Sequence, residues 1–256
     1  MEEDIFLFHR RILILGPVDS GKSYLFRRII ELWKRRGYRF TALDTDVGQS
    51  TLGLPTTITL MERGNTTFFF YGFTTPRAHP PRFLAGVSRM NRAGRIVVDT
   101  TGYIEYPGGL ELKRAKIEML NPDLIVAFPS TDPGWKEFLD SLPFKVIRMK
   151  REPAVKKRSS REREIYRNKK LREYFSETQE FEVKKNSLFP VKLGTRPMAG
   201  ALVSLRQGNT DISLGYIKSL QGERVKIMVP RGKNHPGYIL FSTYLYEGFP
   251  SQPSLF

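Results

Sequence analysis

An eight-residue segment near the start of the chain carries the residue types that bind phosphate. This segment, GPVDSGKS at residues 16–23, lies between an apolar run and a stretch with helical spacing. Gly16 and Gly21 allow backbone N–H groups to point at phosphate oxygens, and a helix that begins at Gly21 adds its N-terminal dipole. Lys22 is expected to reach the β- and γ-phosphates, and Ser23 to place its hydroxyl on Mg²⁺. The predicted nucleotide-binding residues are Gly16, Pro17, Val18, Asp19, Ser20, Gly21, Lys22, Ser23 and Tyr24.

Two further segments place carboxylates directly after short apolar runs. LDTDVGQS contains Asp44 and Asp46, and IVVDTTGY contains Asp99. Ligands of open α/β sheets gather at the carboxyl ends of the strands. A carboxylate there can take a proton from an attacking hydroxyl or hold a metal-bound water. The alternative for Asp44 and Asp46 is a structural role at a turn, whereas Asp99 is typical of a Walker B acid that holds Mg²⁺ through water.

A dense run of Arg and Lys follows, from residue 150 to residue 172. Arg163 and Arg167 are four residues apart, so a helix would bring them onto one face. Arginines over a transferring phosphoryl group can contribute roughly 10³–10⁵ in rate. A solvated charged helix is the alternative interpretation. The position of the run after the predicted sheet favours a lid, over about residues 150–176.

The elements that must position these residues are predicted from hydrophobic spacing. Over the first 150 residues, short apolar runs such as RRILIL, RFTALD and RIVVDT alternate with helical patterns. This alternation predicts a parallel α/β sheet with right-handed crossovers. The tail carries four short strand patterns separated by Gly and Pro turns. We therefore predict a P-loop NTPase sheet flanked by helices over residues 1–185, with the arginine-rich lid, and a small β domain over residues 186–256.

Composition narrows the class of partner. Of the 256 residues, 42 are Lys or Arg and 26 are Asp or Glu, a formal charge of +16. This surplus favours a polyanionic partner, with nucleic acid ahead of an anionic membrane surface, and a merely solvated basic surface is the alternative. The absence of cysteine excludes disulfides and thiolate sites. The N-terminus is not typical of a signal peptide and no stretch approaches the ~18 apolar residues of a membrane span, so we expect a soluble, cytoplasmic protein without a membrane partner.

Five motifs, in order, resemble those of the polynucleotide 5′-hydroxyl kinases of RNA processing, a family that includes kinase subunits of tRNA splicing and mRNA 3′-end cleavage. They are GPVDSGKS (phosphate loop), DTDVGQS (D-V-G-Q signature), YGFTTPRAHP (G-x-T-T-P segment), DTTGY (T-x-G-W clasp) and RSSREREIYRNKKLREYF (arginine lid). The resemblance runs from about Ile12 to Phe175. It implies transfer of the γ-phosphate of ATP or GTP, with Mg²⁺, to the 5′-hydroxyl of single-stranded or end-exposed RNA or DNA.

The resemblance also implies roles for particular residues. Asp46 would activate the 5′-hydroxyl, and Tyr103 would stack on the terminal base. The implied catalytic residues are Lys22, Asp46, Arg158, Arg163 and Arg167, and the implied metal site comprises Ser23, Asp46 and Asp99. The implied nucleic-acid-binding residues are Gln49, Thr74, Thr75, His79, Thr100, Gly102 and Tyr103.

The chain departs from the family pattern at four positions: Tyr103 replaces the usual Trp, His79 a common Asn, Asp99 a frequent Asn, and Tyr24 a usual Thr. None of these changes removes a group that the chemistry requires. Two other functions stay open: a nucleotide-binding scaffold without turnover, and a P-loop NTPase switch suggested by the DTTG sequence. No Asn-Lys-x-Asp guanine-reading motif supports the switch. The sequence predicts no particular protein partner.

Overall fold

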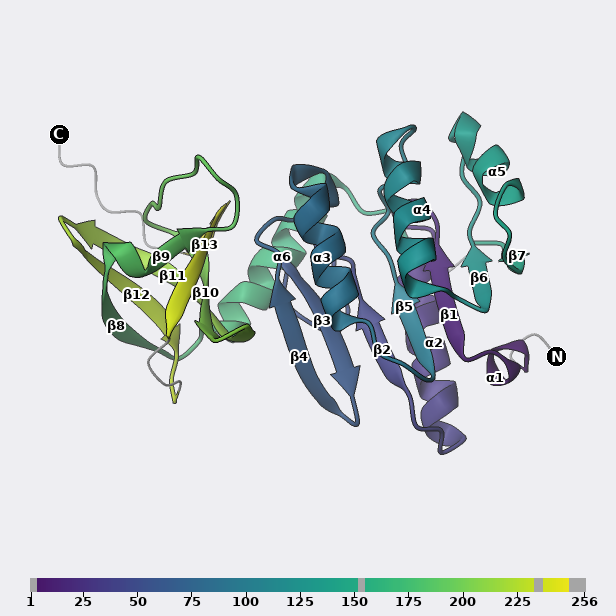
Figure 1. Ribbon diagram of the computed structural model, residues 1–256, viewed down its shortest axis with the longest axis horizontal. Coiled ribbons are helices and arrows are strands. Elements are labelled where there is room, and N and C mark those ends of the chain that lie inside the picture. The colour runs from purple at the N-terminus through teal and green to yellow at the C-terminus, as the bar shows by residue number, and fades with distance from the viewer. Residues whose placement is uncertain (1–3, 152–154, 233–236, 249–256) are drawn as a thin grey trace.

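The computed structural model describes residues 4–151, 155–232 and 237–248, and these contain two β-sheets joined by a long helix (Figure 1). The first sheet has seven strands in the order β4-β3-β2-β5-β1-β6-β7. Its parallel strands are β1 (Arg11–Leu15), β2 (Thr41–Asp44), β5 (Ile96–Asp99), β6 (Leu124–Ala127) and β7 (Val146–Arg148). An antiparallel hairpin, β3 (Thr57–Glu62) and β4 (Asn65–Phe70), extends one edge. The predicted parallel α/β sheet is confirmed.

Helices cover both faces of this sheet, which explains why its strands are apolar on both sides. Ile12 and Ile14 of β1 pack toward α1 (Ile5–Phe8) and α2 (Lys22–Arg35). Leu13 and Leu15 face the opposite core. That core is covered by α3 (Pro80–Met90), α4 (Gly108–Leu120) and α5 (Pro133–Asp140), with the short turn η1 (Pro76–Ala78) before α3. In the part of the chain that the structure describes, no helix is long and apolar enough to cross a membrane.

The second sheet has six strands in the order β8-β12-β11-β10-β13-β9. They are β8 (Thr178–Lys184), β9 (Leu188–Pro190), β10 (Ala201–Gln207), β11 (Thr210–Gln221), β12 (Arg224–Pro230) and β13 (Tyr238–Leu245), with the turn η2 (Lys185–Ser187) between β8 and β9. The sheet thus begins at Thr178, before the predicted boundary at residue 186. Strand β8 was not predicted from the sequence, because it is an edge strand whose one buried residue, Val183, has polar neighbours.

The joining helix is α6 (Ser160–Tyr174), which lies within the predicted lid; residues 152–154 of that lid are outside the described residues. Its first turn is fixed by a capping box, in which the Ser159 hydroxyl accepts from the Glu162 N–H and the Glu162 carboxylate accepts from the Ser159 N–H. Beyond its end, Phe175 packs edge-on against Tyr216 of the second sheet. The helix is therefore fixed at both ends.

Candidate functional site

The three predicted chemical segments meet at one edge of the first sheet. Strand β5 lies between β1 and β2, and all three are parallel, so the loops that follow them leave the sheet side by side. Asp44 and Asp99 are register partners at the ends of β2 and β5. The fold therefore brings the phosphate loop, the Asp46 loop and the Asp99 loop together, as the sequence predicted.

The phosphate loop after β1 is wound by three residues with positive φ. Gly16, Asp19 and Gly21 have φ values of 154°, 55° and 106°. Lys22 is the first residue of α2 and is buried, and its Nζ donates to the carbonyl of Pro17 at 2.5 Å. A loop wound in this way presents its backbone N–H groups to an anion together with the N-terminus of α2. This backbone conformation suits nucleotide phosphates.

Ser23 and Asp99 face each other at the N-terminus of α2. The Ser23 hydroxyl donates to Asp99 Oδ2 at 2.7 Å. Burial of Asp99, followed by the charge of Asp44 beside it, raises the pKa of the Asp99 carboxyl, while Lys22 opposes this shift. Hydroxyl and carboxylate oxygens are ligands that Mg²⁺ accepts alongside phosphate oxygens and water. Among the described residues, no group of three or more His, Cys, Asp or Glu side chains is placed to hold a metal ion.

The two acids of the LDTD segment have different environments. Asp44 is fully buried and binds the loop that follows it. Its carboxylate accepts hydrogen bonds from the backbone N–H groups of Asp46, Thr51 and Leu52 and from the hydroxyl of Ser50. Asp46 accepts from Gly48 and Gln49 through Oδ1 and lines a cavity of about 520 Å³ beside the phosphate loop. Asp44 thus organises the loop, and Asp46 is the acid of this segment that lines the cavity.

The beginning of the lid lies directly on the phosphate loop. Asp19 accepts from the backbone N–H of Arg158 and from Nη2 of Arg163, each at 2.9 Å. Gln49 lies between the lid and the Asp46 loop, and its Nε2 donates to the carbonyl of Arg163 at 3.2 Å. The cavity is closed on this side by Lys156, Lys157, Arg158, Glu162 and Tyr166. Gln49, predicted to contact nucleic acid, is therefore part of the contact between lid and loop.

Arg167 lies elsewhere. It hydrogen-bonds the Tyr244 hydroxyl of the second sheet, and Glu164 and Glu247 carry the nearby negative charge. Arg163 and Arg167 share a helix face, as predicted, but one further turn moves a residue about 6 Å along the axis. That displacement takes Arg167 past the phosphate loop. The structure therefore brings Arg158 and Arg163 to the loop and places Arg167 at the second sheet.

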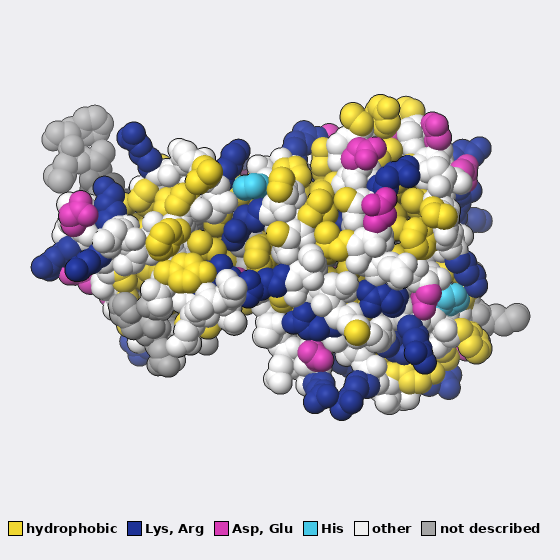
Figure 2. Space-filling view, viewed as in Figure 1, with side chains coloured by type: hydrophobic (Ala, Val, Ile, Leu, Met, Phe, Trp, Pro, Cys, Tyr) yellow, Lys and Arg dark blue, Asp and Glu magenta, His cyan; other side chains and the backbone are white. Residues whose placement is uncertain are grey.

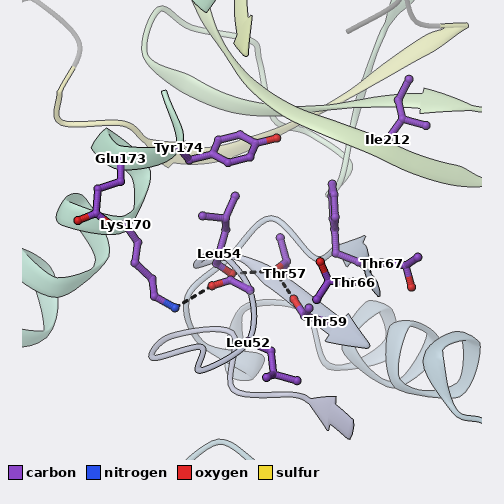
Figure 3. Close-up of a pocket in the computed structure, with 12 residues that line it drawn as sticks. Leu52, Leu54, Thr57, Thr59, Thr66, Thr67, Lys170, Glu173, Tyr174 and Ile212 are labelled. Carbon is purple, nitrogen blue, oxygen red and sulfur yellow. Dashed lines mark hydrogen bonds between the residues drawn. The ribbon is translucent and has the colours of Figure 1, made fainter. Parts of the chain in front are cut away.

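The second half of α6 holds the loop that carries Asp46. Lys170 Nζ donates to the carbonyls of Ser50 and Gly53 at 2.6 and 2.9 Å. Figure 3 shows Lys170 and Tyr174 beside a cavity of about 580 Å³ that is also lined by threonines of β3 and β4. The Tyr174 hydroxyl accepts from the backbone N–H of Leu214 at 3.1 Å. This half of the helix thus connects the Asp46 loop to the second sheet.

Residues 74–79 and 100–105, which contain the predicted nucleic-acid-binding residues from Thr74 to His79 and from Thr100 to Tyr103, are here called the clasp. Both lie against the phosphate side of the site. A Cβ atom on Gly48 would lie 2.7 Å from the carbonyl oxygen of Thr74, and one on Gly102 would lie 2.5 Å from the backbone N of Val18. Only glycine permits such close approach without displacement of the loops. The clasp is therefore in direct contact with the phosphate loop and the Asp46 loop.

The predicted clasp residues differ in exposure. Thr75 is exposed, whereas Thr74, His79, Gly102 and Tyr103 are half-buried. The backbone N–H of His79 donates to the Tyr71 hydroxyl at 3.0 Å.

Thr100 does not reach the surface: it is fully buried, and its hydroxyl donates to the carbonyl of Ile14 at 2.8 Å. The Thr100 side chain is therefore not exposed on the clasp, and its contact with nucleic acid stays a prediction. Thr100 directly follows the buried strand β5, and its hydroxyl is used to join β5 to β1.

Two lysines beneath the site were not predicted. Lys113 and Lys116 of α4 are each 1 % exposed. Lys113 Nζ donates to the Thr101 carbonyl at 2.5 Å, and Lys116 Nζ donates to the Thr45 hydroxyl at 2.6 Å. Burial lowers the pKa of both amines, that of Lys116 to about 7, although Asp99 opposes the shift at both. These lysines therefore hydrogen-bond the segments that directly follow β2 and β5.

Comparisons with known proteins identify the family that the chain resembles. The model of the family described as "mRNA cleavage and polyadenylation factor CLP1 P-loop" matches residues 16–177. A polyribonucleotide 5′-hydroxyl-kinase of Pyrococcus furiosus is 31% identical over 180 residues, which cover 64% of this chain and 50% of that protein. One of Methanocaldococcus jannaschii is 28% identical over 232 residues, covering 84% and 57%. The chain spans about half the length of the curated relatives it matches.

A solved structure also resembles the chain. The Clp1p chain in a Clp1p–Pcf11p complex superposes with a TM-score of 0.78 at 14% sequence identity, covering 95% of this chain and 76% of that chain. At this level of identity the likeness concerns the fold alone. It covers both sheets of the present structure, because nearly the whole chain is included.

Proposed function

The chain belongs to the CLP1 P-loop family, and on this premise we propose that it transfers the γ-phosphoryl group of ATP or GTP to the 5′-hydroxyl end of RNA or DNA. The observation that carries the proposal is the closure of the lid on the phosphate loop. Asp19 of that loop binds the Arg163 guanidinium and the backbone N–H of Arg158, and the cavity beside the loop is lined by both Arg158 and Asp46. A phosphoryl donor, positive charge for the transferring group and an acid for the acceptor hydroxyl are thereby provided in one place.

The phosphate side would bind and polarise the nucleotide. Backbone N–H groups of residues 16–23 and the Lys22 ammonium would hold the phosphates, once Lys22 exchanges its bond to Pro17 for a phosphate oxygen. Ser23 and Asp99 would hold Mg²⁺, which neutralises charge on the phosphates. Arg158 and Arg163 would stabilise the charge that spreads over the phosphoryl oxygens as the transfer proceeds.

The acceptor would enter from the clasp. The oxygen of the 5′-hydroxyl would form a bond to the γ-phosphorus while the bond from that phosphorus to the β,γ-bridging oxygen breaks. Asp46 would accept the proton that the hydroxyl loses in this step. The products are a 5′-phosphorylated strand and the nucleoside diphosphate. Stacking of the terminal base on Tyr103 would position the hydroxyl without reading sequence. The names of the archaeal relatives favour RNA as the acceptor.

The charge of the protein suits this acceptor. Lys and Arg side chains are spread over the face seen in Figure 2, where Asp and Glu are sparse. The net charge of +16 would draw in a strand and hold its phosphates. Neither a scaffold nor a simple NTPase requires an acid and lid arginines around one cavity, so the kinase accounts for more of the site.

The test is transfer of label from γ-labelled ATP or GTP, with Mg²⁺, to short 5′-hydroxyl RNA and DNA. Wild type is compared with Asp46→Asn and Arg158→Ala, and with Arg161→Ala as a control that removes an exposed charge from the first turn of α6. We expect label on the oligonucleotide with wild type and the control, and loss in the other two. Bound ATP without transfer would favour the scaffold, and hydrolysis that oligonucleotide does not change would favour the switch.

A further inference from the structure

Arg77 of the clasp takes no part in the chemistry described so far. It lies in η1, between the Thr-Thr-Pro segment and α3. Its guanidinium carbon is 4.9 Å from the centroid of the Tyr103 ring, and its Nη2 forms an ion pair with Glu105. Arg77 therefore joins the two clasp segments, residues 74–79 and 100–105, directly at the aromatic ring proposed to receive the terminal base.

The stability of the fold does not require this contact. The side chains of Arg77 and Glu105 are 58% and 69% exposed, and exposed ion pairs contribute only about 0–1 kcal/mol. The segments are already held by the close approach of Gly102 to Val18 and by the buried Ile104. The long Arg77 side chain nevertheless lies over the Tyr103 ring in the clasp, and ordering it there has an entropic cost.

The chemistry of the pair suits a nucleobase. An arginine guanidinium and an aromatic ring both present flat faces on which unstacked bases stack. Tyr103 offers a smaller face than the Trp usual in the resembled family, and a guanidinium on the other side of the base would restore the contact area. The exposed Arg77 can move outward to admit a base while Glu105 keeps it above the ring.

We propose that Arg77 is the second wall of the clasp, so that the 5′-terminal base of the substrate lies between the Tyr103 ring and the Arg77 guanidinium. Glu105 is the positioning residue that orients this guanidinium. The proposal rests on the proposed kinase function and adds to it the part of the substrate that is recognised. It assigns the terminal base, rather than the phosphates further along the strand, as the group that Arg77 contacts.

The experiment compares two 5′-hydroxyl RNAs that differ only in whether the terminal nucleotide carries a base or is abasic. Each is titrated with wild type, Arg77→Ala, Arg77→Lys and Glu105→Gln. Arg63→Ala is the matched control, because Arg63 is an exposed arginine in the β3–β4 turn at the opposite end of the sheet. Thermal unfolding of Arg77→Ala should match that of wild type to within about 2 °C, since the side chain is exposed.

We expect Arg77→Ala to lower kcat/KM about five- to fiftyfold on the base-bearing RNA, mainly through KM, and to leave the abasic RNA nearly unaffected. Arg77→Lys keeps the charge without the plane and should recover only part of the loss. Equal losses on the two RNAs, or none on either, would overturn the proposal while wild-type transfer upheld the kinase. Failure of wild type to label either RNA would overturn the kinase function, and this proposal with it.

Discussion

Lys22 and Asp99, on the phosphate side of the site, are buried and hydrogen-bonded to neighbouring residues, whereas Arg77 and Glu105, in the clasp, are more than half exposed. The phosphate side is held together by side-chain bonds, such as the pair between Arg163 and Asp19. The clasp is held by backbone packing at glycines, and the side chains of Arg77 and Glu105 are exposed there. Both lie at the same edge of one sheet.

This difference corresponds to what each side would have to bind. A phosphoryl group changes its charge distribution during transfer, and fixed charges in a dry setting stabilise that change most. The end of a nucleic acid strand varies in base and in sequence, and flat exposed faces accept every base. Buried charges on one side and exposed faces on the other are therefore the expected division between chemistry and recognition.

The largest effect expected from the difference between the two sides concerns two arginines of the lid. We expect Arg158→Ala to lower the transfer rate by roughly 10³, because it removes a positive charge that would stabilise the phosphoryl group during transfer. We expect Arg167→Ala to leave the transfer rate nearly unchanged and to lower the melting temperature, because Arg167 bonds Tyr244 of the second sheet. Single-turnover transfer and thermal unfolding, measured on both variants, separate the two effects.

The opposite pattern would contradict the comparison. If Arg167→Ala lost the rate and kept the melting temperature, the lid would have to rearrange until Arg167 reached the phosphate loop. Arg161→Ala serves again as the control, since it removes an exposed charge from the same helix as Arg167.

The sequence was sufficient where local chemistry dictates the backbone. GPVDSGKS needs positive φ at Gly16 and Gly21, and the structure has it. Apolar runs predicted the parallel sheet, because strands buried on both faces have few other compositions. The same reasoning placed Asp46 beside the phosphate loop, because parallel strands end at a common edge.

The sequence could not predict the burial or the partners of side chains whose surroundings depend on the tertiary arrangement. Lys113 and Lys116 lie in ELKRAK, a pattern typical of a solvated helix face, and their burial depends on strand ends distant in sequence. Arg167 has the helical spacing of a lid residue, but the position of the second sheet determines its partner. Arg77 lies within a quoted motif, and only the fold brings it to Tyr103.

A smaller effect tests the buried Lys116 of α4, which lies beneath the phosphate side and the clasp. Burial lowers the pKa of Lys116 from its ordinary 10.5 to about 7, although Asp99 opposes this. Between these values the unfolded chain binds a proton that the folded protein does not, so the contribution of Lys116 to stability rises as pH increases from about 7 to about 10. Lys116→Met lacks this contribution. We therefore expect the melting temperature of wild type to rise relative to the variant across that pH range.

Thermal unfolding of both proteins from pH 6.5 to pH 10 checks this, and their difference removes groups that titrate equally in each. Loss of the bond from Lys116 to Thr45 adds an offset that does not vary with pH. Lys169→Met is the matched control, because Lys169 is exposed on α6. A difference that stays constant with pH would show that Lys116 is not held as a buried amine.

The smallest effect concerns the stacking face of the clasp. Tyr103→Trp enlarges the ring on which the terminal base would lie, and stacking on an aromatic residue is worth roughly 1–3 kcal/mol per base. The added area should lower KM for a 5′-hydroxyl oligonucleotide about two- to fivefold, with kcat unchanged, because the ring binds the ground state and the transition state alike. Tyr103→Ala should raise KM by more than Tyr103→Trp lowers it. If both substitutions instead changed kcat at constant KM, Tyr103 would act on the reacting hydroxyl. The clasp would then belong to the chemistry rather than to recognition.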